Sequence, residues 1–149
     1  MSGLTPPNEH ALVFPMLAMV ALTATTLAIL FRSRLRAVRE RRVSARYFTI
    51  YQGETEPESS AQAARHFANL FEAPTLFYVA CVTAMVTHHA GAGMQILAWL
   101  YVAARAVHSF IHLGSNRVPH RIAAYFTSWA VLLAIWISLA LGVALERAA

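Results

Sequence analysis

Four long apolar stretches constrain this chain more than any other feature of its sequence. A helix needs about 20 residues to cross the roughly 30 Å hydrocarbon core of a bilayer, and each stretch is long enough. They cover about residues 11–31, 67–87, 93–113 and 122–145. The sequence therefore predicts an all-α integral membrane protein, in which a single domain over residues 1–149 forms a four-helix bundle.

The composition and the first stretch agree with this prediction. The chain is 58% hydrophobic and 13% charged, whereas soluble domains are about half apolar and about a quarter charged. The first stretch differs from a secretory signal peptide because Glu9 and His10 precede it and no basic segment does. It also runs directly into arginines without a small-residue cleavage site. We therefore interpret it as a retained span.

The arginines predict the orientation of the bundle. All twelve basic residues are arginine, and ten of them lie in the 32–65 connection or in the 114–121 turn. Arg105 lies inside the third stretch, which leaves only Arg147 for the opposite side. Because basic loops stay on the cytoplasmic side, both termini are expected on the non-cytoplasmic side. The basic run is then a topology signal or a contact for lipid headgroups, and we expect no nucleic-acid partner.

Polar residues inside the stretches indicate a functional site. An ionisable residue inside a membrane-spanning helix costs roughly 3 kcal/mol to insert into the bilayer, so its presence favours a functional role. Helical spacing places these residues in three groups: Arg65, Asn69 and Glu72; Arg105, His108 and His112; and Arg121 with Tyr125. With the orientation above, Glu72 lies about 10 Å and Arg105 about 12 Å from the cytoplasmic ends of their helices. The groups therefore share one layer.

This shared layer favours a bound ligand over a purely structural role. A structural ion pair between Glu72 and Arg105 would explain those two residues alone. The additional amide, imidazole and phenol groups indicate a ligand site instead. Arginines outnumber the single glutamate in the layer, and the guanidinium fork binds carboxylates in a bidentate manner. We therefore predict that the ligand is a small polycarboxylate anion.

Two alternatives involve the histidines. His66 with His108 or His112 could form a bis-histidine haem site, but the last two residues already belong to the predicted anion site. His108, His112 and Glu72 could hold a metal ion, although Arg105 and its neighbours would repel a cation. We therefore expect neither metal nor haem.

The segment RHFANLFEAP at residues 65–74 resembles the signature of the MAPEG family, the membrane-associated proteins in eicosanoid and glutathione metabolism. The segments ARAVHSFIHLG at 104–114 and NRVPHR at 116–121, followed by Tyr125, are similar to its third and fourth helices. Arg34-Leu35-Arg36 resembles the basic exit of its first helix. The resemblance extends over essentially the whole chain.

The resemblance implies a homotrimer of four-helix protomers that uses glutathione as a co-substrate. Glutathione would lie in a cytoplasm-facing site between protomers, and a lipophilic substrate would arrive from the membrane lipids. By position, the arginine that stabilises the thiolate is Arg121. The implied glutathione-binding residues are Arg34, Arg65, Asn69, Glu72, Arg105, His108 and Tyr125, with His112 included from the polar face. The implied activity is transfer of glutathione to a lipophilic electrophile or reduction of a lipid hydroperoxide.

Four positions differ from the better-known members of the family, and one of them is Pro74, which follows the glutamate sooner than in the animal enzymes. Ala68 stands where those members have a second arginine, and His112 stands where they have tyrosine. Ile122 stands where prostaglandin-synthase-like members have serine. These differences argue against prostaglandin or leukotriene synthesis and favour a bacterial-type member in the inner membrane. Because the family also contains non-enzymatic members, the alternative is a non-catalytic lipid-binding protein or an accessory subunit of a membrane complex.

Overall fold

The fold consists of helices over residues 9–148, which are the residues that the computed structural model describes. A short 3₁₀ helix, η1 (Glu9–Leu12), leads into the first long helix. The remaining elements are α1 (Val13–Arg39), α2 (Tyr47–Ile50), α3 (Glu58–Asn69), α4 (Ala73–Val86), α5 (Ala92–Leu113) and α6 (Val118–Ala148).

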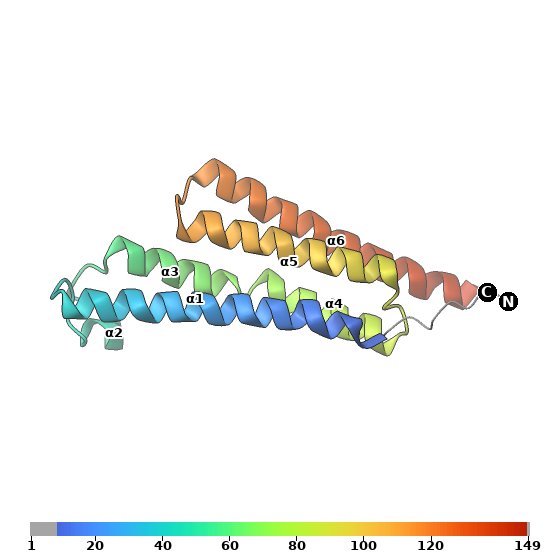
Figure 1. Cartoon of the computed structure of the whole chain (residues 1–149), viewed down its shortest axis with the longest axis horizontal. Coiled ribbons are helices and arrows are strands. Elements are labelled where there is room, and N and C mark those ends of the chain that lie inside the picture. Colours follow the sequence, from blue (N-terminus) through green and yellow to red (C-terminus); the bar gives the residue numbers. More distant parts are fainter. Residues whose placement is uncertain (1–8, 149) are drawn as a thin grey trace.

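The long helices lie side by side as two pairs. α3 and α4 follow each other in line beside α1, and α5 packs along α6 (Figure 1). The 40–57 connection and the α5–α6 turn lie toward one end of the bundle, and the end of α6 lies at the other (Figure 1). Within residues 9–148, four helical segments are long and apolar enough to span a membrane: His10–Arg39, Glu58–Val86, Ala92–Leu113 and Val118–Ala148. The predicted all-α architecture with four spans is confirmed.

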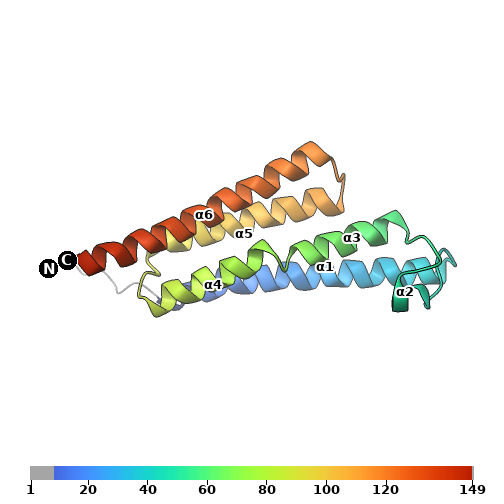
Figure 2. The same ribbon diagram turned by 180° about the vertical axis from the view of Figure 1, so that it is seen from behind.

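The second span differs from the predicted stretch 67–87 at its beginning and in its middle. It begins at Glu58, and it is interrupted at residues 70–72 between α3 and α4 (Figure 2). Pro74 explains the interruption, because proline has no N–H to donate to the Leu70 carbonyl and its ring clashes with that carbonyl. Proline is well tolerated in the first turn of the next helix, where Pro74 lies.

The interruption changes the expected arrangement of the polar residues of this span. Phe71 N–H donates to the Ala68 carbonyl at 3.0 Å, which tightens the chain at the end of α3. Glu72 lies beyond that end and directly precedes α4. The expectation that Arg65, Asn69 and Glu72 lie along one continuous helix is therefore wrong for Glu72.

The distribution of polar and apolar side chains suits a lipid environment. Large apolar residues such as Phe14, Phe110 and Phe126 are exposed, and lipid tails are as apolar as these side chains. The buried polar residues are Thr26, Ser60, His66, Arg105, His108, Ser109, His112 and Ser128. A polar group inside a membrane needs an internal partner, and Thr26 donates its hydroxyl to the Leu22 carbonyl at 3.0 Å.

An apolar core lies between α4, α5 and α6. Phe77 of α4 stacks on Tyr101 of α5, with ring centroids 4.5 Å apart and ring planes 17° from parallel. Leu132 and Ile135 of α6 belong to the same cluster of buried residues. The Tyr101 hydroxyl has no hydrogen-bond partner in the described part of the chain. Since Tyr101 precedes Arg105 by one helical turn, this core directly adjoins the polar layer.

The 40–57 connection contains α2 and a hydrogen-bonded loop. Ser44 donates its backbone N–H and its hydroxyl to the Glu54 carboxylate, at 2.8 and 2.5 Å. These two hydrogen bonds, with the side-chain bond contributing more, lower the pKa of Glu54. The contact therefore stabilises the fold above the unfolded-state pKa of Glu54 and is lost as the pH falls through its folded-state pKa.

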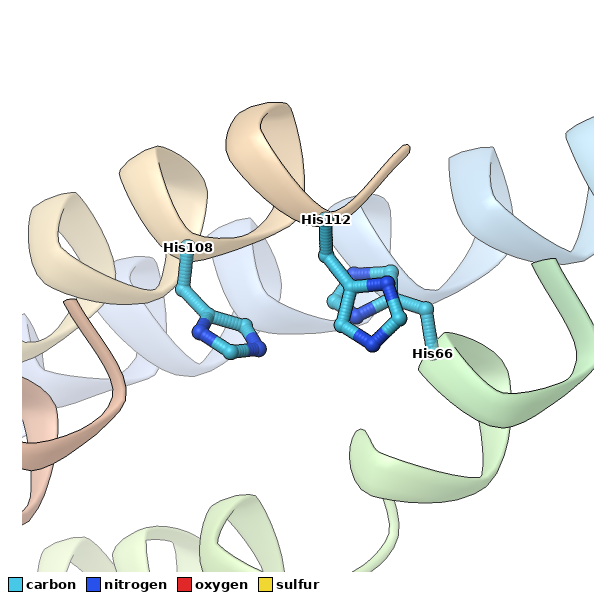
Figure 3. Close-up of side chains that lie close together, drawn as sticks. All are labelled: His66, His108 and His112. Carbon is cyan, nitrogen blue, oxygen red and sulfur yellow. The ribbon is translucent and has the colours of Figure 1, made fainter. Parts of the chain in front are cut away.

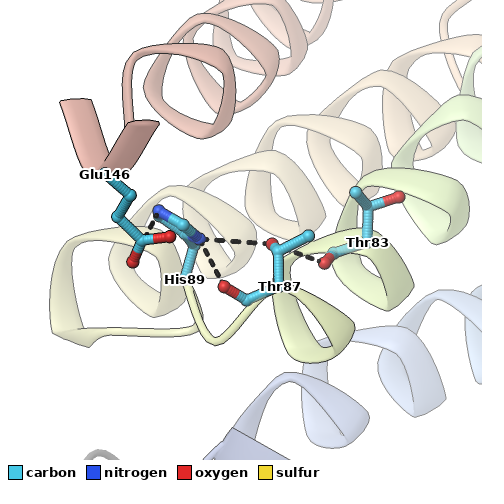
Figure 4. Close-up of polar contacts among 4 residues, drawn as sticks. All are labelled: Thr83, Thr87, His89 and Glu146. Atoms are coloured by element: carbon cyan, nitrogen blue, oxygen red, sulfur yellow. Dashed lines mark hydrogen bonds and ion pairs between the residues drawn. The ribbon is translucent and has the colours of Figure 1, made fainter. Parts of the chain in front are cut away.

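At the opposite end of the bundle, His89 joins the α4–α5 link to α6 (Figure 4). Its Nδ1 lies 2.6 Å from the Thr87 carbonyl oxygen, and its Nε2 lies 3.6 Å from Glu146 Oε1. The Thr87 hydroxyl in turn donates to the Thr83 carbonyl at 2.8 Å. The imidazole ring packs against Gly142, where an added Cβ would lie 2.2 Å from His89 Cδ2. Any larger residue at position 142 therefore requires the His89 ring to move.

The variant Gly142→Ala is expected to lower the free energy of unfolding by about 1–3 kcal/mol, because overpacking forces the His89 ring out of place. Thermal melting of the detergent-purified protein measures the effect. Gly93→Ala is the matched control, since a Cβ at Gly93 meets no atom within 4 Å. Alanine is the better helix former, so this control should melt at or slightly above the wild-type temperature. Equal melting temperatures for the two variants would contradict the prediction.

Candidate functional site

Arg105 of α5 lies at the centre of the candidate site and is fully buried. Its Nη2 donates to Asn69 Oδ1 at 2.7 Å and to the Asn69 carbonyl oxygen at 3.4 Å. Its Nε and Nη1 have no hydrogen-bond partner within residues 9–148. A buried donor without an acceptor costs about 1–3 kcal/mol, and more when it is charged. The arrangement therefore favours an anionic acceptor beside this guanidinium.

Asn69 connects Arg105 to Glu72. Its Nδ2 donates to Glu72 Oε2 at 2.9 Å while its Oδ1 accepts from Arg105. The hypothesis of a direct structural ion pair between Glu72 and Arg105 is therefore replaced by a bridge through an amide. The Glu72 side chain is exposed, because the interruption before α4 carries it past the end of α3. Its carboxylate can still accept hydrogen bonds from a cationic group of a ligand.

His108 and His112 lie on the buried face of α5 that also carries Arg105. Both face His66 of α3 (Figure 3). The ring centroid of His66 lies 4.8 Å from that of His112 and 5.5 Å from that of His108. The spacing of Arg105, His108 and His112 thus predicts their common face, and the partner of the two histidines on α3 is a third imidazole.

Arg121 and Tyr125 of α6 approach the site through His108. His108 Nδ1 lies 3.3 Å from the Arg121 carbonyl oxygen, and its ring centroid lies 5.7 Å from that of Tyr125. The Arg121 guanidinium donates through Nη1 to Asn116 Oδ1 at 2.8 Å. Asn116 adopts a left-handed conformation with φ of 48°, which asparagine tolerates. A neutral amide therefore orients the guanidinium of Arg121 without neutralising its charge.

Arg34 and Arg65 are placed differently from the other predicted residues. Arg34 of α1 lies 3.7 Å from the Glu56 carboxylate, and its guanidinium lies over the rings of Phe48 and Tyr51. Arg65 is exposed on α3. The residues that the chain itself brings together are Asn69, Glu72, Arg105, His108, His112, Arg121 and Tyr125. Arg34 instead contacts the 40–57 connection.

Sequence reasoning missed Gln62 and Ser109, which help to hold the site together, and considered His66 only in the haem alternative. Gln62 donates through Nε2 to the His112 carbonyl, and His66 Nε2 lies 2.8 Å from Ser109 Oγ. Gln62, His66 and Asn69 are spaced by four and three residues, so a helix that begins before residue 67 places them on one face. This spacing was not used in the prediction, because hydropathy set the start of the span at residue 67, whereas α3 begins at Glu58.

The fold and this polar layer define a multi-span membrane protein with a site between its helices. The sequence profile of the MAPEG family matches residues 12–141, a range that includes every residue of the site described above. The chain therefore belongs to the MAPEG family. The family includes glutathione transferases and peroxidases as well as non-catalytic members. No curated protein and no solved structure matches the chain.

Proposed function

We propose that this protein is a membrane-bound glutathione transferase or peroxidase. The observation that carries the proposal is Arg105, a fully buried guanidinium with two nitrogens that lack partners among the described residues. Glutathione offers two carboxylates, and a carboxylate is a strong acceptor for a guanidinium. It also offers an ammonium group, which suits the exposed carboxylate of Glu72. Membership of the MAPEG family supports this ligand.

Arg121 is proposed to stabilise the thiolate of glutathione. Only the thiolate is a competent nucleophile, and a neighbouring guanidinium lowers the pKa of a thiol by charge attraction. In the transferase reaction, the sulfur attacks an electrophilic carbon, a C–S bond forms, and the displaced electron pair leaves with the leaving group or takes up a proton. In the peroxidase reaction, the sulfur takes the terminal oxygen of the hydroperoxide and releases the alcohol. A second glutathione then forms the disulfide and releases water.

An apolar groove next to the polar layer suits the lipophilic substrate. It lies between α1 and the α3–α4 junction, and Leu27, Phe67, Phe71 and Tyr78 are among its lining residues. Its empty volume is about 940 Å³, including the open side. Phe71 directly precedes Glu72 in the chain, so the groove adjoins the polar site. An electrophile dissolved in the bilayer can therefore reach the thiolate without crossing water.

The proposal includes an assembly and an orientation. Arg65 and Glu72 are exposed on the isolated protomer, and in a homotrimer a neighbouring protomer would cover such surface and complete the glutathione site with its own Arg34. The distribution of arginines favours a site on the cytoplasmic side, with both termini opposite. A bacterial-type member with this orientation would reside in the inner membrane.

A non-catalytic lipid-binding protein or accessory subunit is the second candidate function. The apolar groove favours this candidate as well, because it can hold a lipid without any chemistry. The two candidates differ in thiolate formation, which only the enzyme requires.

Glutathione is expected to raise the melting temperature of the detergent-purified protein, because a ligand that binds only the folded state stabilises it. An ultraviolet difference spectrum should also show a thiolate band, and this band should disappear in Arg121→Ala. Arg117→Ala is the matched control, since Arg117 is an exposed arginine one turn earlier and should keep the band.

Each outcome separates the candidates. Stabilisation with a thiolate band that depends on Arg121 supports the enzyme. Stabilisation without a band in the wild type indicates a binding protein, and the absence of any response at millimolar glutathione overturns the glutathione site.

A further inference from the structure

A cluster of three buried histidines lies between α3 and α5 (Figure 3). His66, His108 and His112 are 0%, 3% and 7% exposed, respectively. One ring nitrogen of each lies within 4.8 Å of those of the other two. Burying a polar group is unfavourable unless that group has a partner. The buried ring nitrogens of the cluster are therefore expected to have binding partners.

The partners of His66 determine which of its ring nitrogens carries the hydrogen. The Ser109 hydroxyl donates its single hydrogen to the Arg105 carbonyl at 2.8 Å. Ser109 Oγ can therefore only accept from His66 Nε2, which lies 2.8 Å away. With that hydrogen on Nε2, neutral His66 has a free lone pair on Nδ1. This Nδ1 is buried and has no hydrogen-bond partner in the described range 9–148.

The partner of His108 likewise determines which of its ring nitrogens carries the hydrogen. Its Nδ1 lies 3.3 Å from the Arg121 carbonyl oxygen, which can only accept a hydrogen bond. Nδ1 therefore carries the hydrogen, and the lone pair of neutral His108 is on Nε2. Both this Nε2 and the Nδ1 of His112 are buried and lack a partner among the described residues. The cluster thus contains at least two buried lone pairs without a donor.

A transition-metal ion is the electron-pair acceptor that suits such nitrogens. Three imidazoles with an open fourth position form a known type of zinc site, with Zn–N distances of about 2.0–2.1 Å. Tetrahedral geometry then places ligand nitrogens about 3.4 Å apart. The ring nitrogens that lie within 4.8 Å of one another would therefore have to approach by at most roughly 1.4 Å. Ligating histidines donate their other N–H to an oxygen that orients the ring. Ser109 Oγ and the Arg121 carbonyl supply those oxygens here.

Arg105 determines the charge that the site can accept. It lies one turn before His108 on the same face of α5, and its guanidinium opposes a bare cation. An anion such as hydroxide in the open fourth position would reduce the charge of a divalent ion. The same anion would be an acceptor for the guanidinium nitrogens of Arg105 that have no partner within the described chain.

Contrary to the expectation of no metal from the sequence, we propose that His66, His108 and His112 bind a divalent transition-metal ion of the zinc type, with an anion as fourth ligand. The ion joins α3 to α5 beside the contact between Asn69 and Arg105. Its role is structural, because it holds the two helices that carry the anion site. The proposal does not require the transferase or peroxidase activity, but its anion would contact the same Arg105 guanidinium that the proposed function assigns to glutathione.

The test uses full-length protein prepared without a polyhistidine tag, stripped with a chelator and then given Zn²⁺. Elemental analysis after gel filtration is expected to find one zinc per protomer, and zinc should raise the melting temperature. In His66→Gln the zinc affinity should fall on the order of 100-fold or more, since loss of an outer-shell partner alone costs about 10–100-fold. His120→Gln removes an exposed histidine of α6 and should bind zinc normally.

Two results would overturn the proposal: no zinc bound by the wild type at micromolar concentration, or equal binding by His66→Gln and His120→Gln. If His66→Gln does not fold, Co²⁺ bound to the wild type gives the answer, because four-coordinate cobalt absorbs strongly in the visible range. Strong absorption supports the site, and its absence excludes the proposed coordination. Glutathione-dependent melting of the metal-free protein is measured separately, so failure of the metal site and failure of the proposed function remain distinguishable.

Discussion

Replacing Arg105 with methionine is expected to abolish the rise in melting temperature that glutathione causes, while the ligand-free protein stays at least as stable as the wild type. The lost stabilisation is about 2.7 kcal/mol at a glutathione concentration of 100 times Kd. The guanidinium is buried with two nitrogens lacking partners in the described chain, and a buried charge that is not paired is unfavourable, so its apolar replacement removes that cost. Asn69 loses a donor but is only half-buried, so water can replace it.

Two further variants make this prediction specific. Arg105→Lys keeps the charge but loses the planar arrangement of donors, so it should bind glutathione more weakly than the wild type. Arg147→Met removes an exposed arginine at the far end of α6. It should change the melting temperature neither without glutathione nor with it. A wild-type response to glutathione in Arg105→Met would exclude Arg105 from the binding site. A large loss of stability without ligand would show that its guanidinium is structural.

Phe77→Ala is expected to give the largest loss of stability among single substitutions in the core. Phe77 is fully buried and stacks on Tyr101 with a centroid distance of 4.5 Å. Phe→Ala substitutions in buried cores cost about 3–5 kcal/mol. The effect here should fall toward the lower end, because lipid tails are as apolar as the core and mainly the packing contribution is lost. Thermal melting and denaturation in mixed micelles measure the change.

Two control variants accompany Phe77→Ala. Val79→Ala shortens a side chain on the same helix that is 48% exposed, and it should be close to neutral. Tyr101→Phe removes a buried hydroxyl that has no partner within residues 9–148, so it should be neutral or stabilising by about 1–3 kcal/mol. A loss in Val79→Ala as large as that in Phe77→Ala would show that the lipid-facing surface is packed against another protein chain.

The four-span fold could be predicted because uninterrupted apolar length is itself the physical requirement for crossing a bilayer. The residues at which the helices begin and end could not be predicted from apolar length alone. α3 begins at Glu58 with a polar turn that hydropathy assigns to a loop. The interruption at residues 70–72 is encoded by Pro74, whose backbone has no hydrogen to donate, but the apolar composition around it concealed the effect.

The site could be predicted one helix at a time. Spacing alone places Arg105, His108 and His112 on one face of α5, and the structure has them there. Contacts between helices depend on distances that a linear pattern does not contain. For this reason the Asn69 amide between Arg105 and Glu72 was not predicted. The approach of His66 to the α5 histidines was considered only in the haem alternative.

The interruption between α3 and α4 divides the second span into two mechanically separate parts. After the interruption, α4 is fixed in the core by Phe77. Before the interruption, α3 is joined to α5 through the polar contacts of His66 and Asn69. A continuous helix would act as a rigid lever, and any tilt at the ligand end would disturb the core. The interruption at residues 70–72 divides that lever, so a tilt of α3 need not be transmitted through α4 to Phe77 and the core.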